Sequence, residues 1–84
     1  MTLIQKIKSV TSRQELREAL SSSSIEVRQI MLTNAIELLN KEIECDITEG
    51  NIDIALFKMS QVVMLEDELH IVERLILKQR VIAK

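Results

Sequence analysis

Proline is absent from this chain of 84 residues, and glycine occurs once, at Gly50. These two residues interrupt helices most strongly, proline because it lacks a backbone N–H and glycine because it costs about 1 kcal/mol relative to alanine. Little in the sequence therefore ends a helix except its caps and that single glycine. The composition predicts an all-α fold.

Cysteine and histidine also occur once each, at Cys45 and His70. One cysteine cannot form a disulfide within the chain, and this usage is typical of a reducing compartment. A structural zinc site needs roughly four nitrogen or sulfur ligands, which this pair does not supply. Disulfides and structural zinc are therefore excluded as sources of stability, and we expect no metal and no cofactor.

The residues that carry most enzyme chemistry are equally scarce. His70 lies one helical turn from Glu66 and from Glu73, but no nucleophile or electrophile is identifiable beside it. We interpret His70 as an exposed residue without a catalytic role, and Cys45 as a small core or interface residue. We expect no enzyme activity.

Tryptophan and tyrosine are absent, and the formal net charge is −2. Nucleic-acid affinity depends on clustered lysines and arginines and, for single strands, on aromatic side chains that stack on bases, so we expect no nucleic-acid partner. No apolar run approaches the ~20 residues of a membrane span, and the lysine-interrupted opening is too short for a secretion signal. We therefore expect a cytoplasmic protein without membrane attachment.

A chain of this length forms one domain, 1–84, and buries only roughly two thirds of the surface that its unfolded form exposes. Such a domain is marginally stable without help. Because disulfides and structural zinc are excluded, a protein partner is the remaining source of stability.

What the sequence does contain is helix punctuation. Two serine and glutamate pairs have the form of a capping box that starts a helix: Ser12 with Glu15, and Ser23 with Glu26. Gly50 favours the left-handed conformation that ends a helix, and Asn51 or Asp53 is suited to cap the next one. We therefore expect a tight bend at Gly50.

This punctuation divides the chain into an N-terminal helical segment at 1–20, a first hairpin helix at 23–49 and a second at 52–82. The N-terminal segment is either one bent helix or two short ones. The expected architecture is an antiparallel helical hairpin with this shorter segment, in a three-helix or dimeric bundle.

Apolar residues of the second hairpin helix form two main rows. The first row has the alternating three and four spacing that is typical of the seam of an antiparallel helix pair or coiled coil. It consists of Val62, Leu65, Leu69, Val72 and Ile76. The second row lies about 100° or more away around the helix, and consists of Phe57, Met64, Ile71, Leu75 and Ile82. Val63 and Leu77 lie on a third side.

The first hairpin helix cannot cover both rows. A contiguous apolar surface of this length is a binding or self-association site in most soluble proteins. We therefore predict that the second row binds a helical protein partner or a second copy of the chain. The alternative is that the N-terminal segment folds back over the second row and completes a monomeric three-helix bundle.

The last fifty or so residues resemble a known family. A helix that ends in glycine, a tight bend and a second helix reading VMLEDELHIV at Val63 to Val72 resemble the small co-chaperone subunit of type III secretion needle proteins. The matching positions are Leu65, Glu66, Leu69, Ile71 and Val72. This resemblance implies a cytoplasmic helical hairpin that stabilises a repeat-type needle chaperone, the two together keeping the needle subunit soluble. The competing hypothesis is a homo-oligomeric helical adaptor or inhibitor, regulatory or phage-encoded.

Overall fold

The computed structural model describes residues 2–82, which form four helices and contain no β-strand. The all-α prediction is therefore confirmed. The helices are α1 (Leu3–Ser9), α2 (Arg13–Leu20), α3 (Ile25–Thr48) and α4 (Ile52–Ile82). The molecule is elongated, with extents of 51 × 22 × 18 Å.

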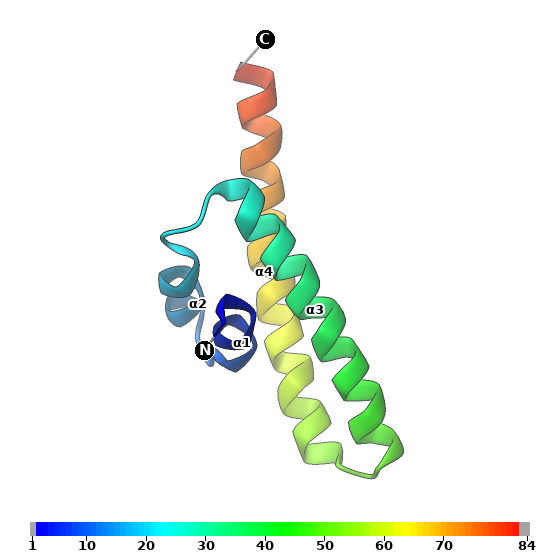
Figure 1. Ribbon diagram of the computed structural model, residues 1–84. Helices are drawn as coiled ribbons and strands as arrows, with labels where there is room; N and C mark the ends of the chain where they lie inside the picture. The colour runs from blue at the N-terminus through cyan, green and yellow to red at the C-terminus, as the bar shows by residue number, and fades with distance from the viewer. Residues whose placement is uncertain (1, 83–84) are drawn as a thin grey trace.

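Helices α3 and α4 form the antiparallel hairpin that the sequence predicts (Figure 1). Gly50 has a φ of +83°, the left-handed conformation that favours glycine. On either side of it, the Glu49 N–H donates to the Cys45 carbonyl at 2.9 Å and the Asn51 N–H donates to the Asp46 carbonyl at 2.7 Å. The last carbonyls of α3 are thereby satisfied within the bend.

The N-terminal segment is two short helices. The chain between the two helices is extended, because Val10 and Ser12 both have extended backbone angles. Ser12 caps α2 as expected, because its hydroxyl accepts the Glu15 N–H at 3.2 Å. The reciprocal bond differs from the predicted capping box, since the Glu15 carboxylate accepts from the Thr11 N–H.

The start of α3 corrects the second predicted cap. Ser24, not Ser23, accepts the N–H of Val27, at 3.3 Å. Ser23 is held in the preceding turn, because its N–H donates to the Leu20 carbonyl and its carbonyl accepts from the Arg28 side chain, both at 3.0 Å. The helix therefore begins at Ile25.

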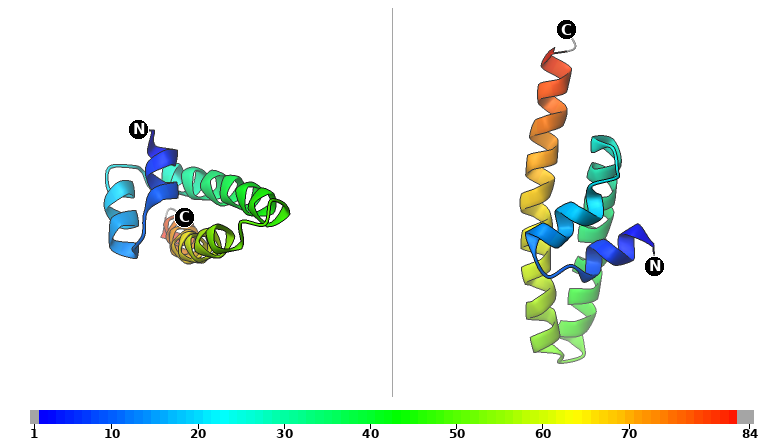
Figure 2. Two further views of the ribbon diagram at one scale, coloured as in Figure 1. Left: turned by 90° about the horizontal axis from the view of Figure 1, so that it is seen from below. Right: turned by 90° about the vertical axis from the view of Figure 1, so that its left-hand side faces the viewer.

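Helices α1 and α2 lie across one face of the hairpin (Figure 2), where α1 contacts α3 and α2 contacts α4. All four helices contribute to a single core. Its buried members are Ile7, Val10, Leu16, Leu20, Leu32, Ala35, Leu39, Ile43, Ala55, Val62, Leu65 and Val72.

Helix α4 has 31 residues and α3 has 24, so their lengths are unequal. The C-terminal end of α4 projects past the start of α3 (Figure 1). Leu77 and Val81 near this end are both exposed. Apolar side chains of α4 thus reach beyond the part of the helix that the hairpin can cover.

Candidate protein-binding surface

The seam residues of α4 belong to the core. Val62, Leu65 and Val72 are buried. Leu69 and Ile76 are partly buried and pack against the same cluster. This face of α4 is therefore occupied within the hairpin and is not open to a partner.

The predicted partner-binding row is not continuous. Phe57 is exposed, and so are Ile71 and Leu75 further along the helix. Between them, Met64 is partly buried and packs against the core. The side chain of Ile82 lies outside the described residues. The row is thus split into an end near the bend and an end near the C-terminus of α4.

The N-terminal segment crosses α4 in the middle of this row. Gln61 is buried, and its side-chain amide donates to the main-chain carbonyls of Lys8 at 2.8 Å and Val10 at 3.1 Å. Both carbonyls lie where α1 ends, so helix bonds within α1 do not satisfy them. Gln61 therefore fixes the end of α1 against α4.

Ion pairs hold α2 on the same stretch. Arg13 pairs with Asp67 at 2.5 Å and Arg17 with Glu68 at 3.4 Å, so the basic N-terminal segment partly neutralises the acidic middle of α4. The N-terminal segment thus folds back on α4, as the monomeric alternative requires. Within residues 2–82, however, it leaves both ends of the predicted row exposed.

A third side of α4 carries exposed apolar residues toward both ends of the helix, and we call this set the outer stripe. It consists of Ile52, Leu56, Met59, Val63, Leu77 and Val81. Their exposed fractions range from 39% for Met59 to 73% for Val81. Sequence reasoning placed only Val63 and Leu77 on this side. The four, three, four spacing from Ile52 to Val63 was the signal that identifies the rest.

The outer stripe faces away from the rest of the molecule. At about 100° per residue, it lies about 120° from the seam and on the side opposite Gln61 and Glu68. Helices α1 and α2 occupy that opposite side (Figure 2). Within residues 2–82, no other helix therefore packs over the stripe.

Exposed apolar residues of α3 are fewer. Val27, Ile30 and Leu38 lie within about 80° of one another on α3 and are interrupted by Asn34, and Ile47 is exposed on another side. Single exposed apolar residues are normal on soluble proteins. Helix α4 is therefore the candidate binding element.

A small charge network ties α1, α3 and α4 together. Lys58 on α4 contacts Glu42 at 3.1 Å and Asp46 at 2.8 Å, and Lys8 also pairs with Glu42. The Lys8 hydrogen bond is the largest influence that lowers the pKa of Glu42 below its usual 4.5, opposed by burial. Hydrogen bonds from Lys58 to Asp46 and then Glu42 raise the Lys58 pKa above its usual 10.5. These shifts are those of a structural ion-pair network.

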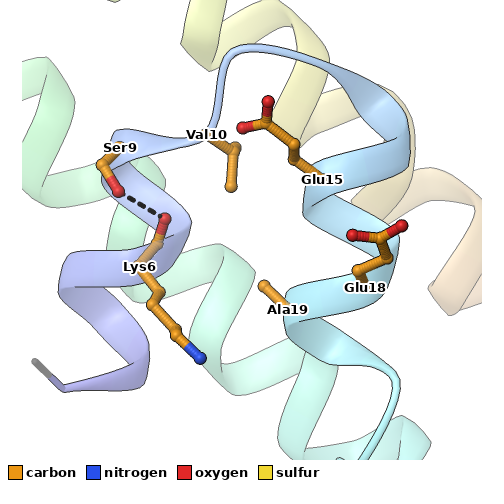
Figure 3. Close-up of a pocket in the computed structure, with 6 residues that line it drawn as sticks. All are labelled: Lys6, Ser9, Val10, Glu15, Glu18 and Ala19. Carbon is orange, nitrogen blue, oxygen red and sulfur yellow. Dashed lines mark hydrogen bonds between the residues drawn. The ribbon is translucent and has the colours of Figure 1, made fainter.

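The clefts of the described chain are open and mixed in polarity. One of about 320 Å³ lies between α1 and α2 (Figure 3). In it the Ser9 hydroxyl donates to the Lys6 carbonyl, while Glu15 and Glu18 project from α2 on the other side. No nucleophile paired with a base lines this cleft, so it offers no catalytic arrangement.

Cys45 is exposed on α3, so of its two interpretations, a core residue or an interface residue, the core one is wrong. Cys45 points away because Leu39 and Ile43 occupy the face of α3 that packs inward. His70 is also exposed. Among residues 2–82, no three His, Cys, Asp or Glu side chains are grouped to hold a metal ion. No helix in that range is long and apolar enough to cross a membrane.

Comparisons with protein-family models, curated proteins and solved structures find no match for this chain. Of the five positions that resemble the needle co-chaperone family, Leu65, Leu69 and Val72 pack in the hairpin core. Packing within the hairpin therefore explains why those three residues are apolar. Ile71 is the apolar member that is exposed.

Proposed function

We propose that this chain is a protein-binding module that docks another helix along the exposed apolar side chains of α4. The observation that carries the proposal is the outer stripe, whose exposed apolar residues lie toward both ends of α4, with Glu66, His70 and Arg74 between them, on a side that faces away from the core. An apolar stripe at helical spacing is the surface by which one amphipathic helix recognises another. The expected reducing, cytoplasmic setting is part of this proposal.

Two versions of this function differ in the partner. In the first, suggested by the resemblance of Val63 to Val72, the chain is a co-chaperone that stabilises a type III secretion needle chaperone and keeps the needle subunit soluble. In the second, the chain is a homo-oligomeric adaptor. The open ends of the predicted row, Phe57 and Ile71 with Leu75, are exposed on a separate side of α4, about 100° or more from the outer stripe.

The test is affinity purification of the tagged chain from its native host, followed by reconstitution with each purified protein that is recovered. Leu56→Glu disrupts the outer stripe, and Ile30→Glu is its matched control. Leu56 and Ile30 are about equally exposed, but Ile30 lies on α3 away from the stripe. We expect Leu56→Glu to abolish reconstituted binding and Ile30→Glu to retain it. Equal binding by the two variants contradicts the proposal.

Co-expression distinguishes the two versions. A co-chaperone is expected to increase the soluble yield of its needle chaperone and to co-purify with it, because a partner that binds only the folded state stabilises that state. A homo-oligomeric adaptor is expected to form a symmetric assembly alone and to leave the yield of such a chaperone unchanged.

A further inference from the structure

We infer that a second copy of this chain docks on the outer stripe, with the two α4 helices antiparallel. The inference rests on the proposed function and names the partner for that surface. It is carried by the spacing of the stripe and by the charges beside it.

Four of the six outer-stripe residues, Ile52, Leu56, Leu77 and Val81, keep the same spacing when α4 is read in either direction. Ile52 and Val81 are separated by about eight turns at about 3.6 residues per turn, so they lie on the same side of the helix. In an antiparallel pair, Ile52 meets Val81 of the second copy, and Leu56 meets Leu77. A two-fold axis repeats both contacts, as a self-complementary interface requires.

The positions between these contacts place an apolar residue opposite an amphipathic one. Met59 meets Arg74 of the second copy, whose aliphatic stem can pack on the methionine while its guanidinium reaches water. Val63 meets His70, whose ring has an apolar body. A parallel pair instead places Arg74 against Arg74, a repulsive contact between like charges.

Charges at the ends of the stripe favour the same orientation. A two-fold axis perpendicular to the helices keeps each flank of the stripe beside the same flank of the second copy. Asp53 and Lys78 lie on one flank, near opposite ends of α4. The antiparallel pair therefore brings Asp53 of each chain beside Lys78 of the other, which gives two complementary ion pairs.

The centre of the interface is its weakest part. Glu66 lies near the two-fold axis and faces the same residue of the second copy. Neighbouring Asp67 is already paired with Arg13 of its own chain. Helices α1 and α2 lie on the opposite side of α4, so two copies can approach without displacing them (Figure 2).

Sedimentation equilibrium over about 1 to 200 µM tests the association. We expect a dimer that Leu56→Glu and Leu77→Glu each weaken by about tenfold or more, and that Ile30→Glu leaves unchanged. Circular dichroism checks that each variant is folded. A wild-type chain that stays monomeric at the highest concentration overturns the inference, and so does a dimer insensitive to Leu56→Glu.

Charge reversal tests the flank. Asp53→Lys and Lys78→Glu are each expected to weaken the dimer severalfold, because each places like charges together, whereas the double variant restores it. Glu66→Gln is expected to tighten the dimer by removing the central repulsion. A double variant weaker than both single variants overturns the antiparallel arrangement.

Disulfide trapping tests the orientation directly. In a Cys45→Ser background, L56C mixed with L77C is expected to give a cross-linked dimer faster than either variant alone, because only the antiparallel pair brings those positions together. Faster cross-linking of L56C with itself overturns the arrangement.

Failure here is separable from failure of the proposed function. If the wild-type chain is monomeric but its binding to a reconstituted partner still requires Leu56, the inferred dimer is wrong and the proposed binding surface is supported. If neither self-association nor binding to any reconstituted partner requires Leu56, both proposals are wrong.

Discussion

The side-chain amide of Gln61, on α4, donates a 3.1 Å hydrogen bond to the main-chain carbonyl of Val10, which follows α1. Both residues are buried. Because this bond and the bond to Lys8 satisfy carbonyls at the end of a helix, Gln61 links the N-terminal segment to the hairpin.

The first prediction follows from this link. Gln61→Ala leaves the Lys8 and Val10 carbonyls without their partner, so we expect a loss of about 1 to 3 kcal/mol in the free energy of unfolding. Urea denaturation measures the loss. Hydrogen exchange is expected to show faster amide exchange in α1 and α2 than in α3 and α4. Unchanged exchange in α1 and α2 contradicts this role.

The second prediction concerns the start of α3. Ser24→Ala removes the hydroxyl that accepts the Val27 N–H and is expected to lower stability by about 1 kcal/mol. Ser23→Ala is the matched control, because Ser23 uses its main chain in the turn, and a change within about 0.5 kcal/mol is expected. Thermal denaturation of both variants shows which serine caps α3. An equal loss of stability in both variants contradicts the assignment to Ser24.

The third prediction concerns pH and the network around Lys58. Glu42 has a pKa below 4.5, so its contribution is present above that value and is lost as pH falls through the lowered pKa. Lys58 has a pKa above 10.5, so its contribution is present below that value and is lost as pH rises through the raised pKa.

Lys58→Met is therefore expected to lower stability by about 1 kcal/mol near neutral pH, and the difference from wild type is expected to shrink at about pH 3. Urea denaturation at several pH values measures this dependence. A deficit that is the same at pH 3 and pH 7 means that lost packing, and not charge, causes it.

A fourth prediction separates the two faces of α4. Leu65 is fully buried in the core, so Leu65→Ala is expected to lower stability by about 2 to 5 kcal/mol. Leu56 is exposed, so Leu56→Ala is expected to change the stability of the dilute, monomeric chain by less than about 0.5 kcal/mol. Chemical denaturation at low protein concentration compares them, and a large loss from Leu56→Ala shows that Leu56 packs within the fold.

The elements that the sequence predicted depend on local chemistry. Gly50 identified the bend because only a left-handed conformation closes it, and Ser12 identified the start of α2 because its hydroxyl caps the helix. Ser23 and Ser24 were not separable by that reasoning, since both are followed by N–H groups that a hydroxyl can reach. The structure separates them through the turn bond from Ser23 to Leu20.

The surface was harder to predict because it depends on contacts between distant segments. Nothing near Gln61 in the sequence indicates that the carbonyls of Lys8 and Val10 will reach it. From the sequence alone, without knowledge of that contact, the row from Phe57 to Ile82 is predicted to be continuous. The outer stripe was partly hidden because Glu66 and His70 interrupt its apolar spacing.

The central claim is that the outer stripe of α4 is the surface through which this chain binds. The most direct measurement compares Leu56→Glu with Ile30→Glu in every association that the wild-type chain makes, with itself or with a reconstituted partner. We predict that Leu56→Glu is folded but loses those associations, while Ile30→Glu keeps them. A folded Leu56→Glu chain that associates as strongly as wild type contradicts the claim.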